Sequence, residues 1–439
     1  MPAPSRFKSP RCFAVLTVFA VFVLGALARP AAAEITFARA DDWEISTDGR
    51  VNGFFSHISG DAYPADTPVN HSLLAGAGLE SRQIDNAGDL STTRFRSGFV
   101  GAVLGFTVKI KLTQETSLRG HIATWNTIET SRNKAAPNPT DVREAYGKVE
   151  GPWGGLLFGR ALALFSRGAI LLDFNYQHGF GLGYPCNADG GGPTCGMVGY
   201  GIVYAGFNPQ LTYNTPDLGG FRLAIGLFDP SNAPGKLERT PLPRVEGELT
   251  FDAKIRGGSL LHFWVNGFYQ YLAQAGDPKN PTATPVLKTA SARAVNFGGW
   301  AELGPVRVGY SSHFGYGIGM NNTLENTPVV FDSNNDPRKF DAYYGLLGVV
   351  LGNLYLNAGI GVSRLFATEQ DLLDAEAAAA AGNAIPDPIR SQRGIAAGMN
   401  YTFSKHLVGA LECFNADNRW YVGDRQVINA FNGGLTMVW

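Results

Sequence analysis

The sequence DVREAYGKVEGPWGGLLFGR, residues 141–160, holds two strand-like segments separated by a Gly-Pro-Trp-Gly turn. We predict a strand over 141–150, a tight turn, and a returning strand over 155–160. The next strand-like segment begins at Asn208, so residues 161–207 form a very long connection. A connection of that length inside a compact domain indicates a functional segment.

The same two-residue alternation recurs along the chain. Between Leu354 and Val362, apolar side chains at even positions alternate with Tyr, Asn and Gly at odd positions. Residues 221–227, 261–270 and 306–314 follow a similar pattern. In a soluble sandwich the apolar face is the core, whereas in a membrane barrel it faces lipid and the polar face lines water. Alternation alone is compatible with both.

Connection lengths distinguish the two architectures. Short turns alternate strictly with long connections along the chain, which is typical of outer-membrane barrels with short turns at one end and long loops at the other. Each segment approaches the ~9–11 residues of a tilted membrane-spanning strand. We therefore predict an all-β fold, a transmembrane antiparallel β-barrel of about 16 strands. The predicted strands are 48–59, 91–104, 116–129, 141–150, 155–160, 208–215, 220–228, 243–254, 258–272, 290–303, 305–316, 340–351, 353–366, 391–403, 406–417 and 427–439.

Closure and constriction follow from this architecture. Alternation continues to the last residue, Trp439, and backbone groups cannot stay unpaired in lipid, so the last strand must pair with the first. The segment 161–207 is the third long extracellular loop, and we predict that it folds into the lumen as a constriction loop. A further Ala-rich stretch, 371–381, predicts a short helix within a later loop.

The first 33 residues have the pattern of a secretory signal peptide. Basic residues near the start precede an apolar run over 13–27 and an Ala-Ala-Ala site at 31–33. The run is shorter than the ~20 residues that a spanning helix needs. We predict a signal peptide over 1–33, export from the cytoplasm, and one barrel domain over 34–439.

Composition and charge exclude several function classes. Gly accounts for 55 of 439 residues and charged residues for only 17%, against usual shares of roughly 7% and 25%. The full chain carries a net charge of −1 and the first 33 residues hold four basic and no acidic side chains, so the remainder carries −1 − 4 = −5. This mild acidity excludes nucleic acid as a partner, because that would need a concentrated basic surface.

No motif for catalysis appears. The chain lacks a lipase elbow, a metal-ligand pair and a phosphate-binding loop, so we predict no enzymatic activity, no cofactor and no metal. A barrel phospholipase would need a serine–histidine pair on the outer face, whereas His121, His262 and His313 fall on the predicted lumen face. The acidic stretch 332–337 is either a calcium loop or a solvated turn, and its spacing matches no defined calcium loop.

The cysteines predict one cross-link. Cys186 and Cys195 lie close together in the long loop, and in an exported protein such a pair indicates a disulfide. The bridge would stabilise the folded state by ~2–3 kcal/mol. Two free thiols are the alternative, and Cys413 has no evident partner.

Three stretches resemble the general porins of Gram-negative outer membranes. Residues 143–146, Arg-Glu-Ala-Tyr, together with 154–160, look like the porin hairpin that leads into the constriction loop. Residues 401–406 are similar to a periplasmic porin turn, with Phe and His in place of the usual Leu and Arg. Trp439 matches the aromatic terminus that porins present to the barrel assembly machinery. The resemblance implies a homotrimer in outer-membrane lipid and lipopolysaccharide, with each barrel passing small hydrophilic solutes.

Charged side chains at the narrowest point would set selectivity. By parity, we predict that four wall arginines line the lumen, that Arg160 enters the loop, and that two loop carboxylates face them. The resemblance also places Arg143 and one of Arg94 and Arg96 at positions of the porin arginine cluster. The alternative is that these charges are ordinary rim residues. The predicted constriction residues are Arg94, Arg96, Arg119, Arg143, Arg160, Asp173 and Asp189.

These patterns favour a water-filled channel for passive diffusion of small hydrophilic solutes and ions. A substrate-specific outer-membrane channel, for sugars or anions, would show a saturable binding site instead. A purely structural barrel would need a plugged lumen, and the long loop is the only segment available for that.

Overall fold

The computed structural model describes the chain after its first 33 residues, with gaps. The described residues are 34–62, 69–71, 89–128, 140–173, 193–231, 237, 240–255, 258–273, 289–321, 330–383, 385–387, 389–421 and 423–439.

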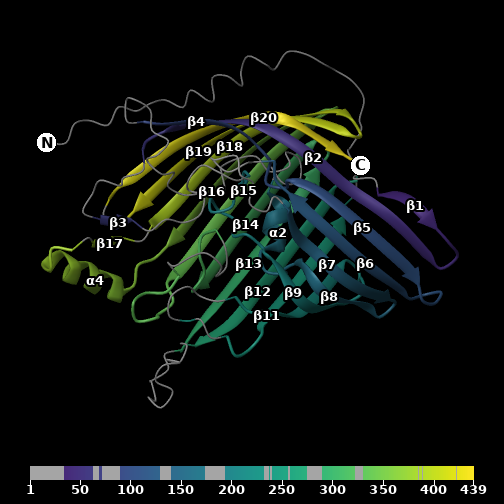
Figure 1. Ribbon diagram of the computed structural model, residues 1–439, viewed down its shortest axis with the longest axis horizontal. Coiled ribbons are helices and arrows are strands. Elements are labelled where there is room, and N and C mark those ends of the chain that lie inside the picture. The colour runs from purple at the N-terminus through teal and green to yellow at the C-terminus, as the bar shows by residue number, and fades with distance from the viewer. Residues whose placement is uncertain are drawn as a thin grey trace.

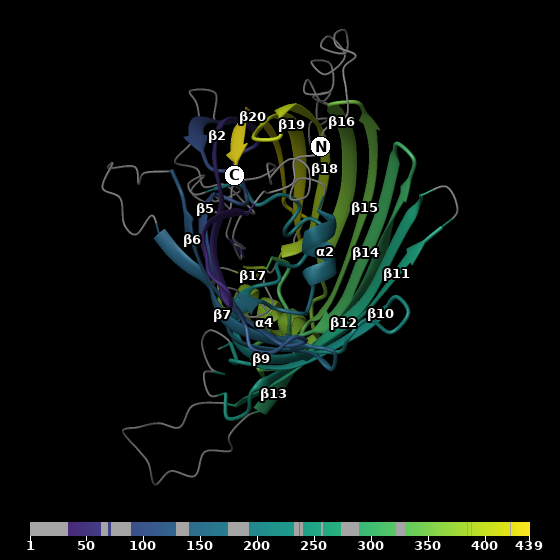
Figure 2. The ribbon, with the colours of Figure 1, turned by 90° about the vertical axis from the view of Figure 1, so that its right-hand side faces the viewer.

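One antiparallel sheet closes on itself to form a barrel (Figures 1 and 2). Its strands are β1 (Ile35–Arg39), β2 (Trp43–Gly60), β4 (Leu90–Arg96), β5 (Ala102–Lys111), β6 (Ser117–Asn126), β7 (Thr140–Gly151), β8 (Gly154–Leu162), β9 (Phe207–Asn214), β10 (Phe221–Phe228), β11 (Arg244–Lys254), β12 (Leu260–Ala273), β13 (Thr289–Leu303), β14 (Val306–Tyr316), β15 (Lys339–Leu351), β16 (Leu354–Leu365), β18 (Ile389–Ser404), β19 (Leu407–Trp420) and β20 (Arg425–Val438).

The wall contains sixteen strand positions, which confirms the predicted number. The sheet has 18 strands, but β1 only adds to the start of β2, and β4 and β5 share one position. Along a single edge, β2 pairs with β5 over 43–50 and with β4 over 54–60. The barrel closes because the last strand, β20, pairs with β2 over Arg50–Gly60.

The predicted strand over 91–104 was wrong in one respect. It is interrupted between β4 and β5 and then continues to Lys111. At the interruption, Asn52 of β2 accepts from the Gly98 N–H and donates to the Val100 carbonyl. These bonds replace ladder bonds, and no local sequence pattern announces them.

Short and long connections alternate as predicted. The turns between β7 and β8, β13 and β14, and β15 and β16 span two residues each, whereas 163–206 separate β8 from β9. Part of that long connection is helical, as α2 (Arg167–Leu172). The Ala-rich stretch forms α4 (Glu369–Ala380), which confirms that prediction. A two-stranded parallel pair, β3 (Val69–His71) with β17 (Ile385–Asp387), joins two long connections.

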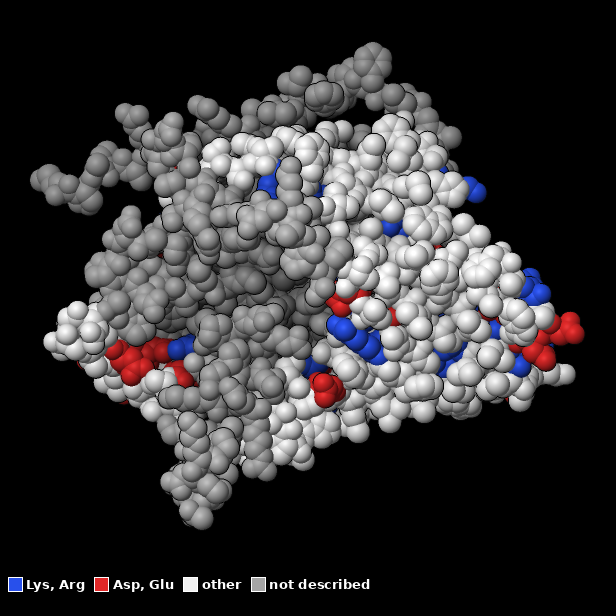
Figure 3. All heavy atoms as spheres, viewed as in Figure 1, with Lys and Arg blue, Asp and Glu red and all other residues white. Residues whose placement is uncertain are grey.

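The two faces of the wall differ in polarity. Large apolar side chains on one face stay exposed, as Ile225 (55%) and Ile360 (61%) do, while polar side chains on the other are buried, as Asn266 and Asn296 are. An apolar band of this kind suits lipid, and the polar face suits a lumen. In Figure 3, charged side chains gather near α4, in the middle of the view and at the right-hand end, and the described surface between them is largely uncharged.

No helix within the described ranges is both long and apolar enough to cross a membrane.

Candidate functional site

The first described part of the long connection, 161–173, is attached to the polar face of the wall at Ser166. The Ser166 backbone is left-handed, with φ 65° and ψ 5°, a conformation that non-glycine residues rarely adopt. The Ser166 N–H donates to Asn266 Oδ1 at 2.9 Å, and the hydroxyl donates to the Val203 carbonyl at 2.5 Å. His313 Nε2 lies 2.8 Å from the same hydroxyl. These bonds from several elements determine the strained conformation.

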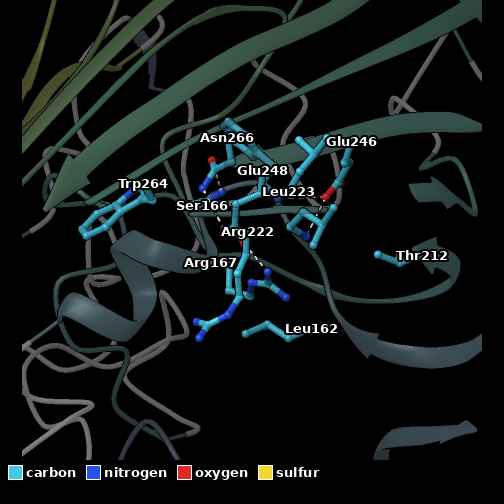
Figure 4. A network of polar contacts seen from close by, with 12 residues as sticks. Leu162, Ser166, Arg167, Thr212, Arg222, Leu223, Glu246, Glu248, Trp264 and Asn266 are labelled. Atoms are coloured by element: carbon cyan, nitrogen blue, oxygen red, sulfur yellow. Dashed lines mark hydrogen bonds and ion pairs between the residues drawn. The ribbon is translucent and has the colours of Figure 1, made fainter. Parts of the chain in front are cut away.

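A buried carboxylate holds the residues just before α2. Glu246 on β11 accepts from the backbone N–H groups of Leu164 and Phe165, both at 2.8 Å (Figure 4). Its other oxygen lies 2.9 Å from Arg244 Nε, and both side chains are about fully buried. A buried charge needs such pairing, so this set of contacts binds the loop backbone to β11.

The helix α2 itself lies against a tryptophan. An ideal Cβ placed on Gly168 would fall 2.3 Å from the Trp264 ring, and one on Gly298 of β13 would fall 2.4 Å from the same ring. Trp264 is therefore enclosed between α2 and the wall. Arg167 adds an ion pair with Glu248, drawn in Figure 4.

The second described part of the connection, 193–207, contacts a different region of the wall. The Tyr200 hydroxyl donates to Asn418 Oδ1 of β19 at 3.2 Å, and the Gly201 N–H donates to Ser363 Oγ of β16 at 3.0 Å. Together the two parts of the connection bind strands widely separated around the barrel.

Three predicted arginines lie on the polar face of β4 and β6. Phe95 is 73% exposed on the outer face, so its neighbours Arg94 and Arg96 point to the other side, and Arg96 is fully buried. Arg119 donates to Thr107 Oγ1 at 3.4 Å.

Acidic residues that sequence analysis missed lie in the same region as Arg119. Glu144 on β7 interacts electrostatically with Arg119, with Arg50 and with Asp48 on β2. His121 lies 3.9 Å from Glu144 and bonds Thr107 Oγ1 through Nδ1. Parity places all these residues on the polar face, but their contacts follow only from the pairing of β2, β5, β6 and β7.

Arg143 connects the wall to the long connection. Its Nε lies 2.9 Å from Asp141 Oδ2, and its NH1 donates to the Tyr204 hydroxyl at 3.3 Å. The guanidinium also lies over the Trp125 ring, 4.8 Å from the centroid. One charge, one loop residue and one aromatic ring of the wall therefore meet at this point.

Arg160 is placed differently from the other predicted arginines. The register sets it opposite Ala145, and Ala145 opposite Ile122, whose side chain is exposed on the outer face. Its Nε donates to the Phe207 carbonyl at 3.3 Å, and its NH1 lies 3.8 Å from Asp141. It stays at the end of β8, beside the entry to the connection.

The predicted loop residues are only partly described. Asp173 is fully buried and accepts from the Met197 N–H at 2.9 Å. Asp189 and Cys186 lie outside the described residues. Cys195 is disulfide-bonded, and Cys413 is a buried thiol. The predicted pairing of Cys186 with Cys195 stays a prediction.

Metal-binding constellations of the usual kind were not found in the described part of the chain, where no three His, Cys, Asp or Glu side chains gather. In the stretch 332–337, Asp332 accepts from the Asn334 and Asp336 N–H groups through Oδ1. Its Oδ2 accepts from the Thr368 hydroxyl. These bonds are those of a turn that is tied to the start of α4, and Asp332 is buried in it at 6% exposure, so the turn is not simply solvated.

Comparison with known proteins agrees with the barrel fold. A sequence profile for Gram-negative porins matches residues 20–435. Comparison with curated protein sequences gives no match.

Solved structures with a similar fold are outer-membrane channels. The channel DcaP of Acinetobacter baumannii aligns with a TM-score of 0.63 at 14% identity, over 92% of this chain and 100% of that one. An anion-selective porin from Comamonas acidovorans aligns at 0.58 and 12% identity, over 91% and 100%. OmpF of Salmonella typhi, in complex with daunomycin, aligns at 0.53 and 13% identity, over 93% and 100%. Identities this low show a shared fold.

Proposed function

The chain belongs to the Gram-negative porin family, and from that premise we propose that residues 161–207 determine what passes through it. Membership makes the protein an outer-membrane channel for diffusion. The finer proposal is that this connection folds into the lumen and narrows it, so that small hydrophilic solutes and ions pass and larger ones do not.

One observation carries the proposal: the connection is bonded to the polar face of several separated strands. Ser166 reaches Asn266 and His313 on β12 and β14, while Tyr200 reaches Asn418 on β19. A segment held on both sides of a lumen reduces the free cross-section between them. Passage through such a pore needs no catalysis, and its width and charge decide what crosses.

The charges beside the connection would sort the solutes. Arg94, Arg96, Arg119 and Arg143 lie on β4, β6 and β7, and Asp173 lies in the connection. Arginines on one wall with carboxylates opposite would create a field across the pore, which favours solutes able to align their dipoles. Asp48, Glu144 and Arg50 lie among these charges, so acidic and basic groups are mixed on this side and we expect weak rather than strong ion selectivity.

A substrate-specific channel is the second candidate. The observation that favours it is the group of Arg143, Trp125, Tyr204 and Phe207, in which the Trp125 and Phe207 rings lie 5.2 Å apart. Aromatic rings beside a guanidinium suit a planar anionic solute. Saturable block of conductance by one such solute would favour this function, and weak block by many solutes would favour general diffusion.

Porin membership and the fold indicate a channel rather than an enzyme. For biogenesis and assembly, we propose export by a signal peptide over 1–33, recognition of the terminal strand and Trp439 by the barrel assembly machinery, and a homotrimer embedded in lipid and lipopolysaccharide.

The deciding experiment is single-channel recording of the refolded protein in planar bilayers, with a KCl gradient across them. We expect large conductance in steps of three, and deletion of residues 174–192 should raise the conductance of each step. A folded, inserted barrel without conductance would overturn the diffusion channel. Unchanged conductance after the deletion would overturn the constriction by this connection.

A further inference from the structure

Charged side chains cross the outer face of the wall at the end of the barrel that carries the long connections. In register, they run from β15 through β16, β18 and β19 to β20 as Asp341, Arg364, Ser391, Arg419 and Arg425. Directly paired residues share one face of a sheet. Ile360 has the same parity as Arg364 on β16 and is 61% exposed, so this face is the outer one.

Three further cations adjoin these side chains on the same face. Arg293 of β13 pairs with Tyr316 of β14, and Tyr316 pairs with Lys339 of β15. Arg393 of β18 pairs with Asp417 of β19. We call the six cations together the basic row: Arg293, Lys339, Arg364, Arg393, Arg419 and Arg425.

The basic row carries more positive charge than the carboxylates beside it neutralise. Asp341 and Asp417 are the acidic side chains at its outer-facing strand positions, so six bases and two acids leave 6 − 2 = +4. Asp61 and Asp424 border the row at β20, and counting them still leaves 6 − 4 = +2. The outer face is therefore basic at this end of β13 to β20.

The arginines around Asp417 are arranged unfavourably in the absence of an anion. Asp417 is shared by Arg419 and Arg425, with nitrogen–oxygen distances of 2.8 and 2.9 Å. These two arginines are also directly paired across β19 and β20, and like charges in that position destabilise a sheet. Arg393 is exposed and makes no hydrogen bond or ion pair with the described residues. Local conflicts of this kind are typical of functional sites.

Aromatic rings and an apolar band adjoin the basic row. The Lys339 ammonium lies 5.2 Å from the centroid of Phe366, and the Arg293 guanidinium lies 5.2 Å from that of Tyr316. Farther along the same strands the outer face is apolar, as at the exposed Leu347. Basic and aromatic side chains that border a lipid-facing band are typical of the level of lipid headgroups.

Phosphate is the anion that these cations suit, because a guanidinium donates two parallel bonds to it and lysine binds it as a point charge. We propose that the basic row binds the phosphates of anionic lipid headgroups, whose acyl chains lie on the apolar band; this presupposes the outer-membrane channel proposed above. Asp341 and Asp417 are positioning residues, which hold the guanidiniums at the surface. Arg364 and Arg425 stay 45% and 53% exposed in their ion pairs, so their remaining donors are accessible to a headgroup.

Binding of phosphatidic acid to the refolded protein in detergent micelles tests the row, with native mass spectrometry as the readout. EDTA is present throughout, so that no divalent cation can bridge lipid and protein. We expect saturable binding of phosphatidic acid, and at least tenfold weaker binding of phosphatidylcholine with the same acyl chains. Removal of three cations in the combined variant Arg293→Gln, Lys339→Gln and Arg393→Gln leaves the ion pairs of Asp341 and Asp417 intact. It should weaken binding of phosphatidic acid about tenfold, since hydrogen bonds to charged groups are lost.

Arg222→Gln is the matched control. Arg222 is an exposed arginine that is likewise held by two carboxylates, Asp217 and Asp252, but its parity with Ala224 places it on the inner face of β10. This variant should bind phosphatidic acid as the wild type does.

Equal binding of the two lipids, or wild-type affinity in the folded triple variant, would overturn the lipid site. Displacement of phosphatidic acid by an equal concentration of inorganic phosphate would show a site for the free anion instead. Loss of the oligomer in the triple variant, with unchanged lipid binding, would assign the row to contacts between copies of the chain. If the triple variant does not fold, the single variants Lys339→Gln and Arg393→Gln decide in the same way. Lipid binding in micelles does not depend on conductance, so a failure here is distinguishable from a failure of the proposed channel function.

Discussion

Ser166 shows how much a single residue contributes to holding the long connection. Its left-handed backbone is stabilised by bonds to Asn266, Val203 and His313. Each net hydrogen bond contributes about 1 kcal/mol, and a buried group left unsatisfied costs ~1–3 kcal/mol. The hydroxyl therefore offsets a conformation that costs about 1–2 kcal/mol for a residue with a Cβ.

Replacing Ser166 should loosen the segment 163–172. Ser166→Ala removes both hydroxyl contacts and keeps the strained backbone, so we expect at least tenfold faster amide hydrogen exchange there. Ser166→Gly loses the same contacts but relieves the strain, and its exchange should increase less. Equal exchange in the wild type and both variants would show that the hydroxyl does not anchor the segment.

Arg143 permits a test of charge selection at one position. Arg143→Ala removes a cation and leaves Asp141 without its 2.9 Å partner, so the pore becomes more negative. The reversal potential in a KCl gradient should shift toward cation selectivity. Arg143→Lys keeps the charge and should retain most of the wild-type value, whereas an unchanged potential in Arg143→Ala would remove this residue from the selectivity determinants.

At the scale of elements, α2 depends on the absence of a side chain at Gly168. A methyl group there would collide with the Trp264 ring, and overpacking of this kind typically costs about 1–3 kcal/mol. We expect Gly168→Ala to unfold at lower urea concentration and to change conductance. Gly120 of β6 has open space around its Cβ position, so Gly120→Ala is a matched control that should behave like the wild type.

The helix α4 depends on a capping box and one ion pair. The Asp371 side chain accepts from the Thr368 N–H, and Thr368 accepts from the Asp371 N–H. Arg338 donates to both carboxylate oxygens at 2.8 and 2.5 Å. Burial alone would raise the pKa of Asp371, but the hydrogen bonds from Arg338 and Thr368 outweigh it and lower the pKa below its usual value.

Because the folded-state pKa of Asp371 is lowered, its contribution is present above the unfolded pKa of ~3.9 and is lost as pH falls through the folded value. A spin label at position 380 should therefore stay immobile down to about pH 4 and become mobile only below it, as pH falls through the lowered folded-state pKa. Asp371→Asn should show this mobility already at pH 7. A label equally immobile in Asp371→Asn at neutral pH would contradict the role of the carboxylate.

At the scale of the whole molecule, the last residue extends the strand pairing that closes the barrel. The Trp439 N–H donates to the Gly49 carbonyl at 3.0 Å, and its carbonyl accepts from the Gly49 N–H at 3.1 Å. The indole covers Gly49, where an ideal Cβ would lie 2.4 Å from the ring. The end of the chain thus completes the pairing that β20 makes with β2.

Trp439→Ala should lower the yield of folded barrel severalfold, because the covering ring at the closing pair is lost. Trp439→Phe keeps an aromatic ring and should fold nearly as well as the wild type. The folded fraction is measured by heat-modifiable migration in gels. Equal yields for the alanine and phenylalanine variants would show that closure needs the backbone bonds alone.

The sequence by itself determined the barrel, the number of its strands and its family. Alternation and connection length are local properties, so segments such as 221–228 and 354–365 could be predicted as strands from their own residues. The interruption between β4 and β5 could not be predicted in this way, because it involves hydrogen bonds from Asn52 on another strand.

Tertiary structure alone decided how the long connection is held. Ser166 and His313 are 147 positions apart, and Leu164 and Glu246 are 82 apart. Parity could place His313 and Glu246 on the lumen face, but not beside a particular loop residue. A contact between distant residues is selected by the closure of the whole barrel, because that closure alone brings their strands to the same side of the lumen.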